Sequence, residues 1–239
     1  MSVHEDRIAV VIGKGGIVKR AIEYAFNVRL KIDSKTGDYV ILPLDENKAT
    51  SEEKPQDSEN LGKQETNLAD TETKISRPHD TPEFREELSQ TQIKIPLSDI
   101  LTMDHSYRTY VCQKVVEAMN HGFSPRKAFK LLDPQTNLDI IDLEDVVGTS
   151  KSKLKRYKGR LIGQNGSIRR AVEEYARVHM SVYRRYLGLI GEYQPLQTAK
   201  TAVSMLLKGQ SHKVVIAFLQ KEYQRFKTEE MTKNWKPVF

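Results

Sequence analysis

The stretch KGRLIGQNGSIRR at residues 158–170 contains a Gly-x-x-Gly loop, and VIGKGGIVKR at residues 11–20 contains a second one, 150 positions earlier. Behind each loop, apolar residues recur at i, i+3, i+4, i+7 and i+8, which is the period of one face of an α-helix. Each loop also follows a short apolar segment that a glycine would end. The repeat therefore predicts two copies of one folding unit, each built around a glycine loop between two helices.

In the first copy, the sequence predicts the order strand, helix, loop, helix, strand, strand. Residues 1–3 supply a strand stub, and Asp6 is the expected cap of a short helix that runs to Ile12. After the loop helix, apolar and polar residues alternate over 28–33, as in a half-buried strand. A turn then leads to a return strand at 39–42.

The second copy repeats this order and adds a closing helix. Glu173 and Arg177 on its loop helix lie four residues apart, so an ion pair between them is expected. A last helix at about 212–231 is expected to pack across the two copies. The other predicted elements are a strand at 138–143, a helix within 154–162, strands at 178–182 and 186–190 joined by a turn at Arg184 and Arg185, and a helix from about Leu196 with Ala199, Val203, Leu206 and Leu207 inward.

The segment between the copies differs from both in composition. Residues 45–90 carry thirteen acidic and six basic side chains, a net charge of −7, and few large apolar residues. We predict a mostly disordered insertion, in which Thr81 as cap and Pro82 at the first position allow one or two helical turns. Order is expected to resume at 93–101. A short helix is expected at 124–132, and a longer one at 104–120 with Tyr107, Val111, Cys112, Val115, Val116 and Met119 inward.

The charge balance outside the acidic segment favours a nucleic-acid partner. The whole chain carries +6, so the residues outside 45–90 carry +13. Cys112 is the only cysteine, which excludes an intrachain disulfide and a cysteine-ligated zinc site and fits a reducing compartment. No apolar run approaches the roughly 20 residues of a membrane span, and the N-terminus lacks an apolar signal core. We therefore expect a soluble cytoplasmic protein without membrane contact.

Glycine loops in this setting can hold a nucleic-acid backbone. Without a Cβ atom, the chain can approach a phosphodiester closely, and the following helix presents the positive end of its dipole. The order of elements is that of a KH domain, whose Gly-x-x-Gly loop clamps four backbone nucleotides. The apolar residues Ile162, Ile168 and Val182 are expected to line a groove for unstacked bases. The candidate RNA-binding residues are Gly13, Lys14, Gly15, Gly16, Lys19, Arg20, Lys158, Arg160, Ile162, Gly163, Gln164, Asn165, Gly166, Ser167, Ile168, Arg169 and Arg170.

Other interpretations of the motifs are weaker. A third Gly-x-x-Gly at 188–191 lies in an apolar strand with no neighbouring base, so we treat it as a chance match. Neither loop has the Gly-Lys-Ser/Thr ending of a nucleotide-triphosphate site. The six histidines show no metal-ligand spacing, and no carboxylates cluster near either loop. We therefore expect no catalytic residue, metal or cofactor, and a nuclease is the remote alternative. Tyr183 and Tyr186 either stack on bases or pack in their turn.

Four segments together resemble a known family: VIGKGG, RLIGQNGSIRRAVEE, the linker HGFSPRKAFKLL and the C-terminal GEYQPLQTAKTAVSMLLKG. They are similar to the Partner-of-Nob family, the archaeal form of the Dim/Krr ribosome-assembly proteins. The resemblance implies an α/β (α+β) fold with two tandem type I KH domains (βααββα), each a three-stranded antiparallel sheet covered by helices, plus a C-terminal helix. The implied domains are 1–120 with the insertion at about 45–92, a helical linker at 121–136, a second KH domain at 137–210, and a C-terminal helix and tail at 211–239.

The resemblance also implies a function without catalysis. The family assembles the small ribosomal subunit, binds the single-stranded 3′ region of 16S rRNA or its precursor, and assists 3′-end processing. The implied partners are a Nob-type endonuclease and the α subunit of translation initiation factor 2, and we expect a monomer. The alternative is a protein-interaction scaffold in ribosome biogenesis or translation initiation. We expect the second loop to be the main RNA site, and the acidic insertion to compete with RNA for the basic grooves.

Overall fold

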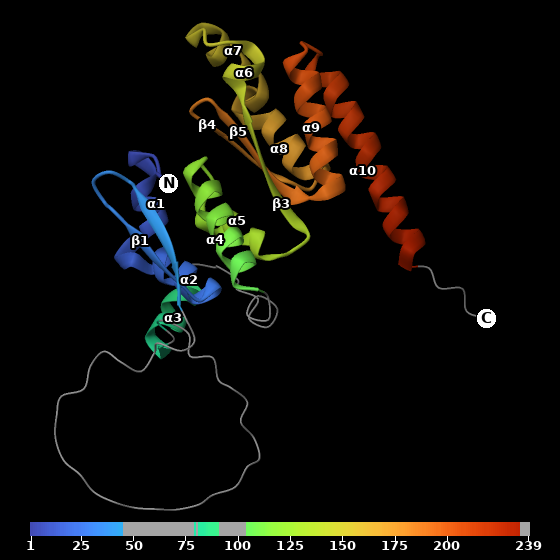
Figure 1. The fold of residues 1–239 in the computed structure, drawn as a ribbon. Helices are drawn as coiled ribbons and strands as arrows, with labels where there is room; N and C mark the ends of the chain where they lie inside the picture. Colours follow the sequence, from blue (N-terminus) through green and yellow to red (C-terminus); the bar gives the residue numbers. More distant parts are fainter. Residues whose placement is uncertain (45–78, 80, 91–103, 235–239) are drawn as a thin grey trace, which may run out of the picture.

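The chain folds into two copies of the predicted unit, joined by a short helical linker (Figure 1). The computed structural model describes residues 1–44, 79, 81–90 and 104–234. The predictions of disorder in most of the insertion and of renewed order at 93–101 lie outside these residues. The first copy comprises α1 (Glu5–Ile12), the 3-10 turn η1 (Lys14–Gly16), α2 (Ile17–Phe26), β1 (Val28–Ile32), β2 (Tyr39–Pro43), α3 (Pro82–Gln90) and α4 (His105–Asn120).

The linker and the second copy follow directly after α4. The linker consists of α5 (Pro125–Ala128) and the 3-10 turn η2 (Phe129–Leu132). The second copy comprises β3 (Thr136–Asp142), α6 (Leu143–Val147), α7 (Lys151–Ile162), the 3-10 turn η3 (Gln164–Gly166), α8 (Ser167–Tyr175), β4 (His179–Tyr183), β5 (Tyr186–Glu192), α9 (Tyr193–Leu207) and α10 (His212–Asn234). The predicted order of elements is confirmed in both copies, and α6 is an addition that the sequence did not predict.

Both copies have an antiparallel sheet, but the expectation of three strands in each is correct only for the second copy, because the first sheet has two strands among the residues that the structure describes. In the second sheet the order is β3-β5-β4. In the first sheet β1 pairs with β2, and the predicted stub makes one bridge, between Ser2 and Asp38, on the other side of β2. Because α1 begins at Glu5, few residues remain for an outer strand, so the stub is present but short. By this order, β1 and β4 occupy the same position at the edge of their sheets.

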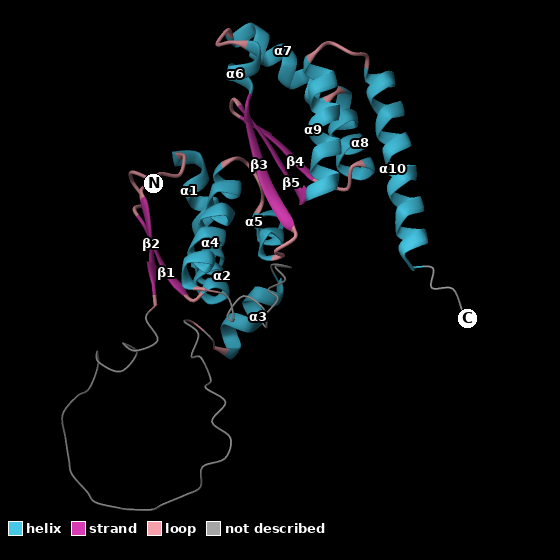
Figure 2. Cartoon of the chain, turned by 45° about the vertical axis from the view of Figure 1, so that its right-hand side comes forward, coloured by secondary structure: helices cyan, strands magenta, loops and turns pink. Residues whose placement is uncertain are grey.

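The elements form successive layers, which Figure 2 shows from the β1–β2 sheet to α10. Helices α1, α2 and α4 cover one face of the first sheet, and the second sheet follows on their other side. Helices α8 and α9 then cover the far face of the second sheet, with α10 outermost. The outer face of the first sheet therefore has no helix of this chain over it among the described residues.

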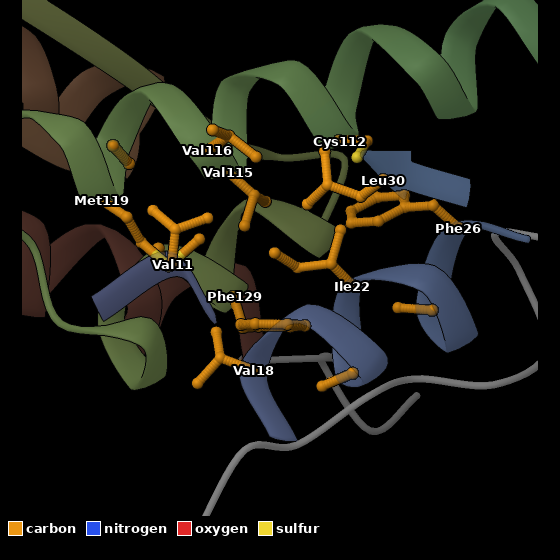
Figure 3. Packing of buried hydrophobic residues seen from close by; sticks show 14 of the residues in the cluster. Val11, Val18, Ile22, Phe26, Leu30, Cys112, Val115, Val116, Met119 and Phe129 are labelled. Carbon is orange, nitrogen blue, oxygen red and sulfur yellow. The ribbon is translucent and has the colours of Figure 1, made fainter. Parts of the chain in front are cut away.

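The linker contributes to the core of the first copy. Figure 3 shows Phe129 of the linker beside Val18 and Ile22 of α2, close to the valines of α4. Ile190 of the second sheet belongs to the same buried cluster. Cys112 is fully buried in this apolar cluster, and burial raises the pKa of its thiol. The two copies therefore share apolar core at their junction.

The segment between α4 and α5 is held from both copies, by α1 of the first and by β5 of the second. The guanidinium of Arg7 in α1 donates to the carbonyl oxygens of Met119 and Phe123, at 2.8 and 2.5 Å. Gly188 in β5 lies against the ring of Phe123, where a Cβ atom would be only 2.5 Å from a ring carbon. The third Gly-x-x-Gly pair thus lies in a strand, as predicted, and its first glycine serves the packing between the copies.

Two details of the predicted helices are wrong. Asp6 does not cap α1, because the helix begins one residue earlier, and its carboxylate instead pairs with Arg184 at 2.8 Å. Tyr107 was expected inside α4 but is 39% exposed, whereas Arg108 beside it is only 6% exposed. The other five residues predicted inward on α4 are buried: Val111, Cys112, Val115, Val116 and Met119.

The prediction that α10 packs across the copies is also wrong. The helix lies along α8 and α9 of its own copy, with Val215 and Leu219 fully buried against them. The connection from α9 has only four residues, which makes an antiparallel neighbour the natural partner. Leu207 of α9 was expected inward and is half-buried.

Candidate nucleic-acid interface

The two glycine loops have nearly the same backbone conformation. Gly13 has φ and ψ of 76° and 169°, and Gly163 has 74° and 171°. The third loop residues, Gly15 and Asn165, have φ of 59° and 52°, and the second glycines, Gly16 and Gly166, have 79° and 75°. The sequence repeat is therefore also a structural repeat, and both loops turn directly into helices α2 and α8 (Figure 1).

The two glycines of each loop are required for different reasons. At Gly163, a Cβ atom would lie 2.6 Å from a side-chain carbon of Ile168 and 2.8 Å from its backbone nitrogen. Gly13 has the same relation to Val18, at 2.5 and 2.9 Å. At Gly166, by contrast, no atom lies within 4 Å of an added Cβ. The first glycine thus lets the chain pack on its own helix, and the second leaves open space in which another backbone can approach.

The second loop presents polar and cationic side chains to solvent. Gln164, Asn165 and Ser167 are exposed, and Arg170 is exposed without an ion pair to any described residue. Lys158 on α7 is half-buried. Gln164 and Asn165 directly precede α8, and Ser167 and Arg170 lie in its first turn, where the positive dipole end of the helix adds to the attraction for an anion.

Arg160, in contrast, has a structural role in this conformation. Its Nε donates to the carbonyl oxygen of Leu206 at 2.8 Å, and an Nη donates to the carbonyl oxygen of Gln210. These oxygens belong to the end of α9 and the turn that follows it, where helix carbonyls lack partners. The guanidinium that the sequence predicts as an RNA ligand is therefore occupied by backbone oxygens.

The first loop is more constrained than the second. Lys14 is exposed and Lys19 is half-buried. Arg20 donates to the carbonyl oxygen of Gly15 at 3.5 Å, and its guanidinium lies 5.6 Å from the ring centre of Phe84 on α3. The equivalent residue of the second copy is the exposed Arg170. The first loop therefore has less free positive charge.

Helix α3 packs against α2, beside the first loop. Thr81 accepts the N–H of Phe84 at 3.2 Å, which confirms the predicted cap, and Pro82 is the first helical residue. Phe84 is 1% exposed, and its ring lies 5.4 Å from that of Tyr24 on α2. A helix within the acidic segment was predicted, but its docking beside the first loop was not, since only the structure pairs Phe84 with α2.

A glutamate at the same position of both copies holds the edge strand. Glu23 accepts the N–H of Leu30 at 2.8 Å, and Glu173 accepts the N–H of Met180 at 3.1 Å. Each glutamate lies ten residues after the first glycine of its loop. The second loop helix is thus tied to β4, the strand beside the predicted groove.

Glu173 also forms two ion pairs that were not predicted, one of them at i,i+4 spacing on its own helix. It accepts from Lys127 of the linker at 2.8 Å and from Arg169 at 3.4 Å. Burial alone would raise the pKa of this carboxyl, but the hydrogen bonds from Lys127 and Met180 lower the pKa below its ordinary value. The expected pair with Arg177 is wrong, because α8 ends at Tyr175 and Arg177 pairs with Glu230 of α10.

The apolar residues near the second loop divide between core and groove. Ile168 is 2% exposed and belongs to the core of the second copy. Ile162 and Val182 are half-buried, so part of each side chain faces solvent between α7 and β4. Two of the three predicted groove residues are therefore open to a base, whereas Ile168 supports the loop from below.

The aromatic residues of the β4–β5 turn contact the first copy. The hydroxyl of Tyr183 donates to Asp6, and the ring of Tyr186 lies 4.6 Å from that of His121. Of the two interpretations left open for these tyrosines, this contact favours packing over base stacking. In the described parts of the chain, no three His, Cys, Asp or Glu side chains lie together as a metal site, and no helix is long and apolar enough to cross a membrane.

The chain is similar in sequence to KH-domain proteins. Residues 137–224 match the eukaryotic-type KH domain (KH-domain type I), in the form of the second KH domain of Partner-of-Nob. A KH domain-containing protein of Methanocaldococcus jannaschii is 30% identical over 227 residues, which are 95% of this chain and 74% of that protein.

Solved structures have the same fold. A protein of unknown function from Aeropyrum pernix has a TM-score of 0.68 and 26% identity, with 98% of this chain and 95% of that chain covered. Dim2p from Pyrococcus horikoshii has a TM-score of 0.63 and 26% identity, covering 92% and 96%. A chain from the complex of a/eIF2alpha, aDim2p and rRNA of the same organism has 0.64 and 26%, covering 94% and 93%.

Proposed function

Since the chain belongs to the Dim2 (Partner-of-Nob) family of KH-domain proteins, we propose that it is an RNA-binding assembly factor of the small ribosomal subunit. Its second glycine loop would hold the single-stranded 3′ region of 16S rRNA or its precursor and present that end for processing. The observation that carries this proposal is the second loop itself, with its open Gly166 and the exposed Arg170. A solved relative in complex with rRNA supports the choice of ligand.

The proposal assigns the main RNA contact to the second copy and a lesser one to the first. Four nucleotides of backbone would lie along Gly163–Gly166, with bases over Ile162 and Val182. Arg170 and Lys158 would neutralise phosphates beside the loop. In the first copy, Arg20 is already engaged by Gly15 and Phe84, so fewer cations remain for RNA.

A charge-insertion variant tests this proposal. Gln164→Asp with Asn165→Asp places two carboxylates on the loop without disturbing its backbone, because Asp tolerates the positive φ at 165. We expect the affinity for a 16S 3′-end oligonucleotide to fall about tenfold or more in fluorescence anisotropy. The matched control is Gln194→Asp with Gln197→Asp, two exposed positions on α9. Equal affinities of the loop variant and the control would refute the proposal.

We also infer protein partners for the first copy, and here the scaffold interpretation has its support. The outer face of the first sheet carries Val40 and Leu42, 55% and 37% exposed, opposite Lys31 and Arg29. We propose the α subunit of translation initiation factor 2 as the partner of this face, because a relative forms a complex with that subunit. Val40→Asp should abolish capture of the purified subunit after RNase treatment. Undiminished capture would contradict this assignment.

The assembly role further predicts a nuclease partner and no cleavage by this chain. We propose that a Nob-type endonuclease trims the rRNA end that the second loop holds. Incubation of a labelled precursor RNA with this protein and a divalent cation should give no product, and addition of the endonuclease should give one. Cleavage by the protein alone would overturn the non-catalytic assignment.

A further inference from the structure

The linker touches both loop helices. On one side, Phe129 packs on Val18 and Ile22 of α2, as Figure 3 shows. On the other side, the ammonium of Lys127 lies 2.8 Å from Glu173 on α8. The helical segment 125–132 is therefore fixed beside the second loop helix, and its exposed side chains have a defined position relative to that loop.

The linker carries positive charge that its own fold does not use. Arg126 and Lys130 are exposed, and neither makes an ion pair or hydrogen bond within the described part of the chain. Lys130 is three residues after Lys127 and four after Arg126, so the three cations are neighbours on one helical face. Long basic side chains that are exposed and unpaired beside a nucleic-acid loop are suited to phosphate oxygens.

A chain of contacts joins this face to the second loop. Arg169, at the start of α8, contacts Glu173 at 3.4 Å, and Glu173 contacts Lys127 in turn. Glu173 is the one acid in this set, and four cations accompany it, so the five side chains Arg126, Lys127, Lys130, Arg169 and Glu173 carry a net +3. The positive surface therefore continues from the loop helix onto the linker.

The linker cations also lie close to the edge strand β4. His179 begins β4, and desolvation together with the charges of Lys130 and Lys127 lowers its pKa to about 4. The geometry agrees, because one carboxylate oxygen of Glu173 accepts both from Lys127 at 2.8 Å and from the N–H of Met180 in β4 at 3.1 Å. A strand of RNA that runs along β4 would meet these ammonium groups next.

We propose that the basic face of the linker, formed by Arg126, Lys127 and Lys130, is a second phosphate-binding subsite. It would hold nucleotides that flank the four nucleotides clamped by the second loop. The inference rests on the proposed RNA-binding function and extends the bound RNA beyond one KH groove. Because Lys127 is partly neutralised by Glu173, Arg126 and Lys130 would make the phosphate contacts, and Lys127 would hold the linker against α8.

Binding of short and long RNA separates this subsite from the loop. The short RNA has five nucleotides from the 16S 3′ end, and the long RNA has twelve, with the same five at its centre. The variant is Arg126→Glu with Lys130→Glu, and the matched control is Lys213→Glu with Lys227→Glu on α10, which has the same net charge. Affinities come from fluorescence anisotropy at 0.1 M salt, and circular dichroism melting checks that each variant is folded.

The subsite predicts a loss that depends on RNA length. The linker variant should bind the long RNA about tenfold more weakly than the wild type, with a salt slope smaller by about 1.4, since each single-strand phosphate contact contributes about 0.7. Its affinity for the short RNA should match that of the control variant. Equal losses for both lengths, or no loss for the long RNA, would overturn the subsite while leaving the loop intact. Failure of the wild type to bind either RNA would instead overturn the proposed function, and the subsite with it.

Discussion

Replacing the glycines of the second loop by alanine should separate three physical costs. Gly166 has a left-handed conformation with open space around it, so Gly166→Ala should cost about 1–2 kcal/mol of folding free energy. Gly163 has φ 74° and ψ 171°, a region that only glycine occupies readily, and its Cβ would also collide with Ile168. Strain of about 1–3 kcal/mol and overpacking of about 1–3 kcal/mol add to roughly 2–6 kcal/mol for Gly163→Ala.

Gly148 supplies the matched control for this comparison. It ends α6 with φ 81° and ψ 170°, nearly the conformation of Gly163, but no atom lies within 4 Å of an added Cβ. Gly148→Ala should therefore carry only the strain, about 1–3 kcal/mol. The difference between Gly163→Ala and Gly148→Ala measures the collision of the added methyl group with Ile168 and with the hydroxyl of Ser167.

Urea unfolding followed by far-UV circular dichroism gives the free energies, and RNA anisotropy gives a second readout. Gly166→Ala should stay folded but bind RNA about tenfold more weakly, because its methyl group occupies the space that a phosphate would approach. Gly148→Ala should bind normally. If Gly163→Ala and Gly148→Ala are equally stable, crowding does not explain the first glycine. Normal RNA binding by Gly166→Ala would refute the role given to the second.

The lowered pKa of Glu173 means that its ionised form stabilises the fold fully above the ordinary pKa of about 4.5, and that this contribution is lost as the pH falls through the lowered pKa. Glu173→Gln should therefore cost about 1–2 kcal/mol at pH 7 and less at pH 3 in urea titrations. An equal cost at both pH values would contradict this. Gly188→Ala should cost about 1–3 kcal/mol by pressing on Phe123, yet leave RNA affinity per folded molecule unchanged. Phe84→Ala should release α3 from α2, which would remove the ring contact of Arg20 and speed proteolysis within 82–90. A proteolysis rate equal to that of the wild type would show that the ring does not anchor the helix.

The helices and strands beside the loops could be predicted from the local spacing of apolar residues. The helical period behind each loop and the alternation at 28–33 depend only on neighbouring residues, and both elements are present in the structure. The positive φ at Asn165 and Gly166 also follows from residue type, since these residues tolerate that conformation. The glycine loop was therefore predictable from the sequence in position and in shape.

Contacts between distant residues were not predictable in the same way. Spacing on one helix suggested Arg177 as the partner of Glu173, but the helix ends before Arg177 and the real partner, Lys127, lies 46 residues away in sequence. Arg160 has the residue type and the position of a phosphate ligand, yet its guanidinium donates a hydrogen bond to the carbonyl oxygen of Leu206 at the end of α9. Which charges are free for RNA is thus a property of tertiary structure.

The apolar residues of the linker have a consequence for how the two loops meet RNA. Because Phe123 and Phe129 are buried between the copies, the linker is not a tether along which they drift apart. The two loops are then held at a fixed separation. An RNA whose two binding segments have the same separation binds both loops without ordering the protein, whereas an RNA with another separation must bend or leave one loop empty. Under the proposed function, discrimination among rRNA ends would then come from the length and shape of the RNA, even where each groove tolerates several bases.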